Sequence, residues 1–304
     1  MSDQAFHEGE IAVQERTGER DLARRIAAGI GSRIVAGALP FLERQRLLAI
    51  TATGDDGFLW TSLWCGEPGF VTSADGQHVR IRRALMAVSA DDPVLRRLAV
   101  GRDVGMLAIE ILSRRRLRIN GTVEMMSGDE ISILVRESVG NCPKYIQRRV
   151  PHTVHTPALP EQGESGQTLD EERQELIERV DTAFVGSIHA SRGADASHRG
   201  GKPGFIRVVN PTMLRVPDYR GNGMFMTLGN FESDPRSSLA AVDFERGRAV
   251  SFSGIAHLRC GIEHPEQPTG GTARYWELDV REWVQVDLPR GVRWELIDPS
   301  PFNP

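Results

Sequence analysis

An internal repeat constrains the fold of this chain more than any other feature. Residues 105–123 align without a gap with residues 238–256, and residues 66–71 align with residues 201–206. The two offsets, 133 and 135 positions, differ by only two residues. Apolar positions recur as well, and the identical pairs in the longer alignment are Ala108 with Ala241, Arg115 with Arg248 and Gly121 with Gly254. The same landmarks in the same order indicate an internal duplication, so we expect two similar folding units.

Short segments with the period of a strand dominate both copies. Residues 117–123 alternate apolar and polar side chains, which is typical of a strand with one buried face. Many such segments and few helices predict a mainly β fold with flanking helices, an antiparallel barrel or sandwich in each copy. The expected strands are 48–53, 58–64, 70–73, 78–82, 105–111, 117–123, 131–136, 184–190, 213–216, 274–280 and 283–286, with another beginning near residue 205. The expected helices lie within 9–30, 41–48, 91–100, 141–149 and 169–180.

Composition narrows the class of protein. The 304 residues carry a formal net charge of −4, which argues against a general nucleic-acid binder. No apolar run approaches the roughly 20 residues needed to cross a membrane, and the polar N-terminus does not resemble a signal peptide. The three cysteines, Cys65, Cys142 and Cys260, lack metal-ligand spacing. We therefore expect a cytoplasmic protein without a metal site.

A basic run on one predicted strand is the first candidate for a binding site. Arg114, Arg115, Arg116, Arg118 and Asn120 lie on this strand and on the turn that leads into it. Guanidinium groups on a rigid strand suit a phosphate or a carboxylate. The alternative is a solvated strand face with a charged hairpin turn.

A second candidate is the polar segment 195–202. Ser197, His198, Arg199 and Lys202 offer hydroxyl, imidazole and cationic donors, and two adjacent glycines allow a ligand to approach the backbone. This composition suits a phosphate. A flexible polar hairpin is the alternative.

A third candidate lies downstream, in the segment 217–230. Asn222, Thr227 and Asn230 offer hydrogen bonds to a polar ring edge or to ribityl hydroxyls. Residues of these types are also the ordinary residues of turns.

Several common motifs are absent from the sequence. There is no Gly-rich dinucleotide fingerprint, no Gly-Lys-Ser/Thr phosphate loop, no Gly-x-Ser-x-Gly elbow and no pair of histidines with zinc-protease spacing. Trp60 and Trp64 share one strand face and are expected in a core or an interface more than as a stacking platform.

Seven segments of the chain resemble the tandem members of the pyridoxamine 5′-phosphate oxidase-like FMN-binding split-barrel family. The resemblance implies a six-stranded Greek-key barrel in each half and FMN in the groove where the two barrels meet. Two barrels in one polypeptide would form an intrachain pseudo-dimer. The expected domains are 1–150 and 169–304, joined by a linker at 151–168. The segments that carry the resemblance are 6–10, 114–121, 141–147, 197–201, 217–219, 227–230 and 300–304.

The resemblance also implies roles for residues of the second copy. Ser197 and Arg199 stand where the family contacts the cofactor phosphate, with His198 between them. Thr227 and Asn230 lie near the segment that completes the phosphate or ribityl contacts.

The first copy departs from this pattern. Ser62 aligns with Ser197, but Leu63 and Trp64 replace the histidine and the arginine that follow it. We therefore expect the second copy to hold the phosphate, while the first copy contributes Trp60 and the basic run 114–118. The substrate-binding pattern of true pyridoxamine phosphate oxidases is not recognisable, so oxidation of vitamin B6 is not expected.

The resemblance thus implies an FMN-dependent oxidoreductase of unknown substrate, with a small-molecule substrate or electron donor as partner. His198 is the one candidate for a catalytic group. The alternatives are a non-enzymatic protein that binds or stores flavin, and the same fold with haem or a deazaflavin as ligand. A homodimer, in addition to the pseudo-dimer, is a further expectation.

Overall fold

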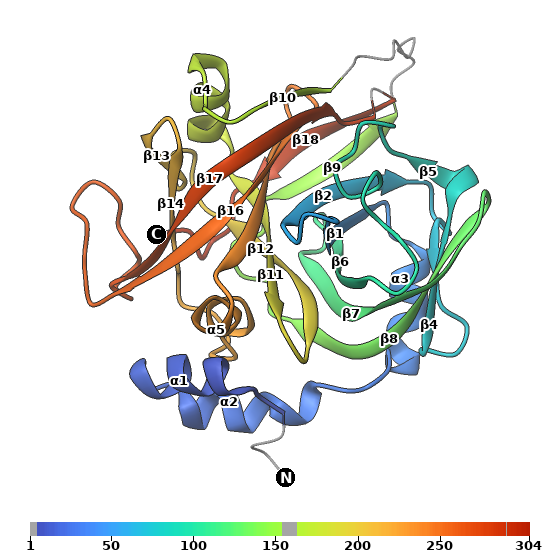
Figure 1. Ribbon diagram of the computed structural model, residues 1–304, viewed down its shortest axis with the longest axis horizontal. Helices are drawn as coiled ribbons and strands as arrows, with labels where there is room; N and C mark the ends of the chain where they lie inside the picture. The colour runs from blue at the N-terminus through green and yellow to red at the C-terminus, as the bar shows by residue number, and fades with distance from the viewer. Residues whose placement is uncertain (1–4, 154–162, 290) are drawn as a thin grey trace.

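The computed structural model describes residues 5–153, 163–289 and 291–304. Two large antiparallel sheets carry the fold (Figure 1). The strands of the first sheet follow the order β3-β4-β8-β7-β6-β1-β2-β5. Their bounds are β1 Leu47–Thr53, β2 Leu59–Gly66, β3 Val71–Thr72, β4 His78–Arg82, β5 Met86–Ala87, β6 Asp103–Glu110, β7 Arg115–Met126 and β8 Glu130–Asn141.

The second sheet follows the order β12-β11-β15-β16-β17-β14-β13, and β10 also pairs with β17. A separate two-stranded sheet joins β9 to β18. The bounds are β9 Arg148–Thr153, β10 Glu164–Gly166, β11 Thr182–His189, β12 Gly193–Gly200, β13 Arg207–Asn210, β14 Met213–Pro217, β15 Arg236–Asp243, β16 Arg248–Cys260, β17 Arg274–Asp287 and β18 Val292–Asp298.

The two sheets repeat one another strand by strand. Six strands of the first, β2-β1-β6-β7-β8-β4, correspond in order to β12-β11-β15-β16-β17-β14 of the second. The registers repeat too, because Ile50 faces Ser62 in the first copy and Val185 faces Ser197 in the second. The predicted fold, two tandem split barrels that form an intrachain pseudo-dimer, is confirmed.

A bulge recurs at the same place in both copies and explains one repeated glycine. The register shifts just before Gly121 in β7 and just before Gly254 in β16. A Cβ atom at either position would collide with a backbone carbonyl of the neighbouring strand. Only glycine fits there, because the bulge brings the two backbones too close for a side chain.

The barrels pack against each other through β1, β2 and β6 of the first and β11, β12 and β15 of the second. At the centre, the hydroxyls of Thr61 and Ser238 lie 2.6 Å apart, and Ser251 donates a 2.7 Å hydrogen bond to the Thr61 carbonyl. An apolar cluster surrounds these polar contacts, and it includes Leu47, Ala49, Leu63, Leu107, Phe184, Ala196 and Ala240.

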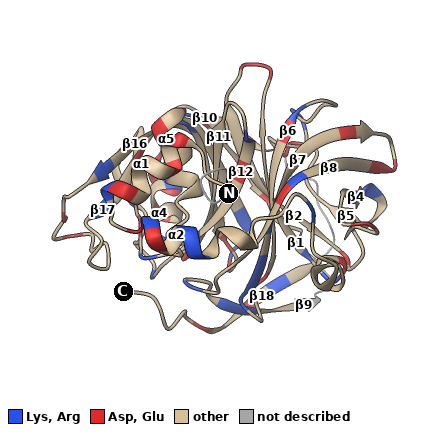
Figure 2. Cartoon of the chain, turned by 90° about the horizontal axis from the view of Figure 1, so that it is seen from below, with Lys and Arg blue, Asp and Glu red and all other residues tan. Residues whose placement is uncertain are grey.

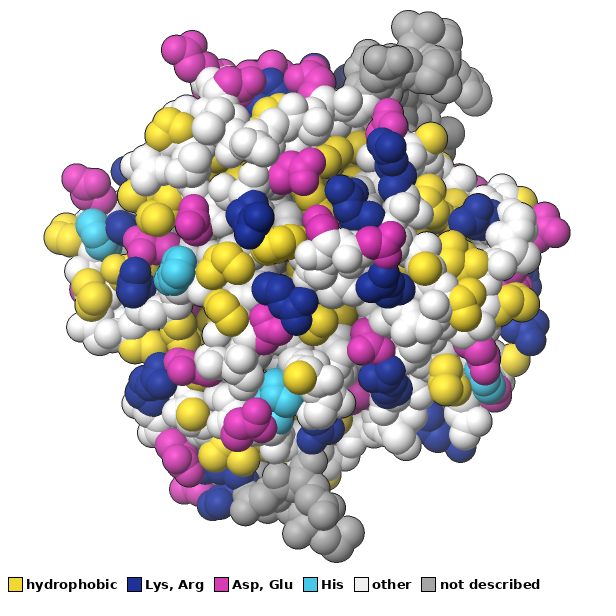
Figure 3. Space-filling model, viewed as in Figure 1, with side chains coloured by type: hydrophobic (Ala, Val, Ile, Leu, Met, Phe, Trp, Pro, Cys, Tyr) yellow, Lys and Arg dark blue, Asp and Glu magenta, His cyan; other side chains and the backbone are white. Residues whose placement is uncertain are grey.

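The α-helices of the described residues flank the sheets: α1 Glu8–Arg16, α2 Arg20–Ile26, α3 Leu39–Glu43, α4 Glu171–Arg179 and α5 Met226–Ser233. Asp170 caps the start of α4, and its carboxylate accepts a 3.0 Å hydrogen bond from the Arg173 N–H, as expected of an N-cap. Among the described residues, no helix is long and apolar enough to cross a membrane. Basic and acidic positions are interspersed along α1, α2 and α4 (Figure 2), and charged and apolar side chains mix on the face seen in Figure 3.

Helix α1 lies directly against α5 at the lower edge of Figure 1. The contact is close because two glycines meet there: a Cβ at Gly9 would collide with the Gly229 carbonyl, and a Cβ at Gly229 would collide with Glu10. The start of α5 is therefore held in place by the N-terminal helix.

Three local predictions are wrong. Residues 141–149 do not form a helix: after β8 the chain turns at Tyr145, whose φ is 66°, and enters β9. Residues 91–100 form turns without an α-helix. The polar segment 195–202 is expected to lie just before a strand that begins near residue 205; its residues 195–200 instead form part of strand β12, and the next strand, β13, begins at Arg207. The predicted linker includes the end of β9 and the short β10, and its residues 154–162 lie outside the described part of the chain.

Candidate functional site

The main candidate site is a hollow between the two barrels, about 830 Å³ with its open mouth included. The first barrel contributes β7 and the turn after β8, and the second contributes β12, the loop after β14 and the start of α5. Seven of the twelve predicted binding residues line it: Arg116, Arg118, Ser197, His198, Arg199, Asn222 and Thr227.

Three guanidinium groups give the hollow its charge. Arg118 is only 6 % exposed; it donates to the Ser197 hydroxyl and lies 3.2 Å from an Asp195 carboxylate oxygen. Arg199 reaches the nearest Asp218 oxygen only at 3.9 Å. Arg116 donates to the Cys142 carbonyl at 2.9 Å and has no carboxylate partner among the described residues.

The positive charges of the arginines in the hollow repel one another. Burial lowers the pKa of Arg116 to about 10; the nearby Cys142 opposes this shift, whereas the charges of Arg118 and Arg199 add to it. Burial also lowers the pKa of Arg199, against the opposing charge of Asp218. Because like charges gathered in a partly dry site repel, an added anion would relieve the site.

His198 provides a neutral polar group in the same wall. The residue is 4 % exposed, and neither ring nitrogen has a hydrogen-bond partner among the described residues. Its ring meets Phe184 edge-on, with the centroids 5.7 Å apart. Burial, together with the charges of Arg116 and Arg199, holds the pKa of His198 well below its usual value. A buried imidazole without partners is a group that a ligand can satisfy.

The start of α5 opens onto the hollow. The chain enters the helix through Phe225, whose φ is 58°, and no described side chain caps the first turn. Thr227 lies in that turn, and its hydroxyl is 2.7 Å from the hydroxyl of Ser197. The first N–H groups of a helix lack partners within the helix and favour a negative charge. This end of the hollow is thus built for an anion.

Five predicted binding residues lie elsewhere. Trp60 is fully buried in the first barrel beneath Arg97, and Ser62 is buried beside it on β2. Arg114 pairs with Asp298 and donates to the Ile146 carbonyl at 2.8 Å.

Arg115 is exposed and lies over the Phe41 ring, 5.1 Å from its centroid. Asn230 is buried below the hollow, where it donates to the Ser187 hydroxyl at 2.8 Å and accepts from His7 at 2.9 Å. Neither residue lines the hollow between the barrels.

Sequence reasoning missed part of the wall. Asn141 lines the hollow from the end of β8, Cys142 and Tyr145 line it from the turn that follows, and Tyr219 lines it from the loop after β14. The rings of Tyr145 and Tyr219 lie 5.2 Å apart at an interplanar angle of 41°. The segments 141–147 and 217–219 carried the family resemblance, which was the available signal.

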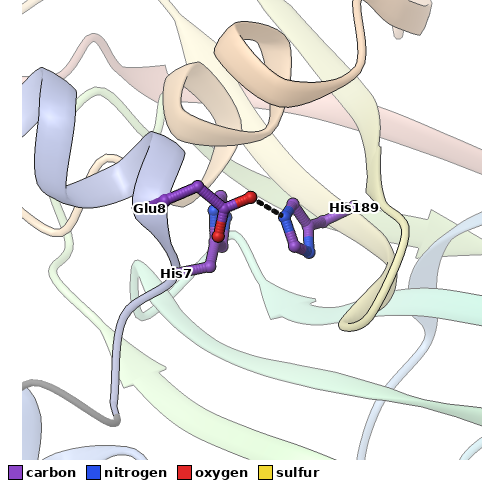
Figure 4. Close-up of side chains that lie close together, drawn as sticks. All are labelled: His7, Glu8 and His189. Atoms are coloured by element: carbon purple, nitrogen blue, oxygen red, sulfur yellow. Dashed lines mark hydrogen bonds and ion pairs between the residues drawn. The ribbon is translucent and has the colours of Figure 1, made fainter.

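A group with metal-ligand spacing lies below this site. The possible ligand atoms of His7, Glu8 and His189 lie within 4.8 Å of one another (Figure 4). The two imidazole rings stack, with centroids 3.9 Å apart and planes at 22°. The nitrogen lone pairs of the two rings therefore lie in two separate, nearly parallel planes, and one metal ion cannot bind a nitrogen of each ring. His7 also donates to Asn230, and His189 donates to Glu8 at 3.0 Å. The group is a hydrogen-bonded stack that fastens α1 to β11.

The position that is equivalent to the main hollow by the internal repeat carries different residues. At the offset of the repeat, Ala249 and Ser251 replace Arg116 and Arg118. On β2, Trp64 replaces the arginine at position 199 and donates a 3.1 Å hydrogen bond to Asp92.

Asp92 itself closes this end of the first barrel. The residue is 2 % exposed, and its carboxylate accepts from the N–H groups of Val94 and Leu95 at 3.0 and 2.8 Å. Burial raises the pKa of Asp92, and the Leu95 N–H and the Trp64 indole oppose that shift. The first barrel therefore supplies its own acidic group at the start of a helical turn, whereas the second barrel leaves that place open to a ligand.

No protein-family model matches the chain, and no curated protein does. Solved structures do match. A variant of HupZ from Group A Streptococcus is 16 % identical, with a TM-score of 0.31 over 38 % of this chain and 98 % of that one. A putative pyridoxamine 5′-phosphate oxidase from Lactobacillus delbrueckii is 16 % identical, with a TM-score of 0.32 over 38 % and 93 %. An F420 reductase is 12 % identical, with a TM-score of 0.27 over 39 % and 98 %. The strand order and register of this chain, taken by themselves, are those of two split barrels. In this split-barrel protein, both barrels belong to one polypeptide.

Proposed function

We propose that the hollow between the barrels binds FMN and that the protein is a flavin-dependent oxidoreductase acting with a small-molecule partner. The observation that carries the proposal is the contrast between the two copies. In the first, the carboxyl of Asp92 occupies the start of the helical turn. In the second, three guanidinium groups converge near the start of α5, whose first turn no described side chain caps. A phosphate monoester fits this donor set.

One group of residues that line the hollow fits the phosphate of FMN. Arg116, Arg118 and Arg199 would hold the phosphate, with the hydroxyls of Ser197 and Thr227 as further partners. Arg118 and Ser197 are already fixed by Asp195, so little side-chain freedom is lost on binding.

The remaining wall suits the rest of the cofactor. Asn222 lines the hollow beside the loop after β14 and offers amide hydrogen bonds to ribityl hydroxyls. Tyr145 and Tyr219 contact each other and together supply one aromatic surface, against which a face of a flat ring can pack. The neutral imidazole of His198 is available to donate or accept one hydrogen bond.

When bound, the flavin would supply the redox chemistry, and the chain would orient it and exclude water from one side. The first test is an absorption spectrum of the purified protein and a titration with FMN and with riboflavin, which differ by the phosphate. We expect FMN to bind at least tenfold more tightly than riboflavin. Equal affinity for the two, or failure to retain either, would contradict the proposed site.

A second measurement separates an enzyme from a flavin-binding protein. The FMN-loaded protein is mixed anaerobically with a nicotinamide nucleotide or with dithionite, and the flavin absorbance is followed before and after an electron acceptor is added. Reduction by a biological donor and reoxidation by the acceptor in repeated cycles indicate an oxidoreductase. Retained FMN that only dithionite reduces would favour a binding or storage role.

A further inference from the structure

A second hollow, between the first barrel and strand β18, is the structural counterpart of the proposed cofactor site. It is lined in part by residues 84–87, directly after β4, and by Cys65 at the end of β2. The pairing of β4 with β8 repeats that of β14 with β17, so residues 84–87 correspond to residues 219–222. By the register of β2 and β12, Cys65 corresponds to Gly200. Both sets line the hollow of their own copy.

The counterpart hollow has lost the means to bind an anion. The arginines of the cofactor site are replaced by Ala249, Ser251 and Trp64, and Trp64 is turned inward onto Asp92. Burial and the charge of Asp92 raise the pKa of the Cys65 thiol to about 12. Burial and the charge of Asp92 both disfavour a negative charge beside Cys65.

The hollow has nevertheless stayed open. It measures about 630 Å³ with its mouth included, against about 830 Å³ for the cofactor hollow. Its walls are apolar, with Leu85 and Met86 on one side and Val292 and Trp294 on the other. Arg46 and Glu67 lie at the same hollow and bond each other at 2.9 Å. An apolar cleft left to water is unfavourable, and such clefts are common ligand sites.

We propose that this hollow is a second ligand site, which takes an uncharged aromatic molecule of one or two rings. Both copies therefore have a cleft at this position. In the first copy, the pair Trp64 and Asp92 stands where the second copy has its phosphate-binding residues. The apolar walls and the indole of Trp294 then favour a flat, neutral ring. The site does not depend on which cofactor the other hollow holds.

Two fluorescent dyes with one skeleton test the proposal. N-phenyl-1-naphthylamine is neutral, and 8-anilinonaphthalene-1-sulfonate adds a sulfonate to the same rings. Both are titrated into the full-length protein with and without excess FMN. We expect the neutral dye to bind one per chain whether or not FMN is present, and at least tenfold more tightly than the sulfonate when FMN is present.

Two variants locate the binding. Ala87→Trp places a large side chain at an exposed position of the hollow, and Ala28→Trp makes the same change at an exposed position beside α2. Binding of the neutral dye should weaken at least tenfold in the first variant and stay unchanged in the second, with FMN affinity unchanged in both. Absence of dye binding, equal binding in the two variants, displacement of the dye by FMN, or equal affinity for the sulfonate would overturn the proposal.

Discussion

Replacement of Arg199 by alanine tests the electrostatic argument with little risk to the fold. The Arg199 side chain is 21 % exposed and its guanidinium lies 3.9 Å from Asp218, and Asp218 keeps a closer partner in Arg274 at 3.0 Å. Arg199→Ala therefore removes one cation from the hollow without leaving a buried carboxylate unpaired. We expect the melting temperature to change little.

The expected loss is one charge-assisted hydrogen bond to the phosphate, about 1.5–3 kcal/mol. Since 1.4 kcal/mol is a factor of ten in affinity, FMN should bind roughly 10- to 150-fold more weakly. Riboflavin has no phosphate, and its affinity should change less than threefold. Titration of the flavin fluorescence measures both constants.

Arg115→Ala is the matched control, because Arg115 is the strand neighbour of Arg116 and is exposed over Phe41. It removes the same charge from the chain and should leave FMN affinity within threefold of wild type. If Arg199→Ala left FMN affinity intact, or weakened FMN and riboflavin equally, the phosphate would not lie beside Arg199.

Three further predictions follow from other contacts. Thr227→Asp places a carboxyl at the start of α5, as Asp92 does in the first barrel, and should weaken FMN binding at least 30-fold while riboflavin binding is largely retained; unchanged FMN affinity would refute the comparison of the two copies. Burial raises the pKa of Glu10 to about 8, so the folded state holds a proton that the unfolded state releases above about 4.5, and stability falls as pH rises towards 8. Burial lowers the pKa of His7 to about 4, and this opposite shift affects stability only below about pH 6.5. Between pH 6.5 and 8 the free energy of unfolding should therefore fall by on the order of 2 kcal/mol. This fall should disappear in Glu10→Gln, as chemical denaturation at several pH values would show. Gly254→Ala should destabilise the second barrel by about 2–4 kcal/mol through the collision at the bulge, and a midpoint of urea unfolding equal to that of wild type would contradict this.

The overall architecture could be predicted because the strands carry a simple signal. On β7 the apolar side chains face the core of the first barrel, whereas the polar side chains of Arg118 and Asn120 face the second barrel and are buried there. Residues 117–123 therefore show a period of two that can be read from a single sequence. The duplication doubled that signal. The same period also separates the arginines, although the prediction grouped them: Arg116 and Arg118 lie on one face of β7, whereas Arg115 faces away from the hollow.

The missed elements depend on contacts distant in sequence. Residues 148–153 form a strand only because β18 pairs with them, with Arg148 opposite Asp298. Residues 141–149, with Pro143 near the start and two arginines at the end, favoured a helix when read locally. Helix α5 follows a glycine-rich loop and has no capping side chain among the described residues, and the close contact of Gly229 with α1 supports it. Neither contact is visible in a window of neighbouring residues.

The placement of β7 and β12 in one polypeptide has a consequence for how the site responds to dilution. A groove shared by two separate subunits falls apart when the protein concentration drops below the dissociation constant of the dimer, and any bound ligand is released with it. Here the two halves are tethered, so each barrel meets the other at a high effective concentration. Occupancy of the hollow should therefore depend on the concentration of ligand alone, which suits a protein present in few copies per cell.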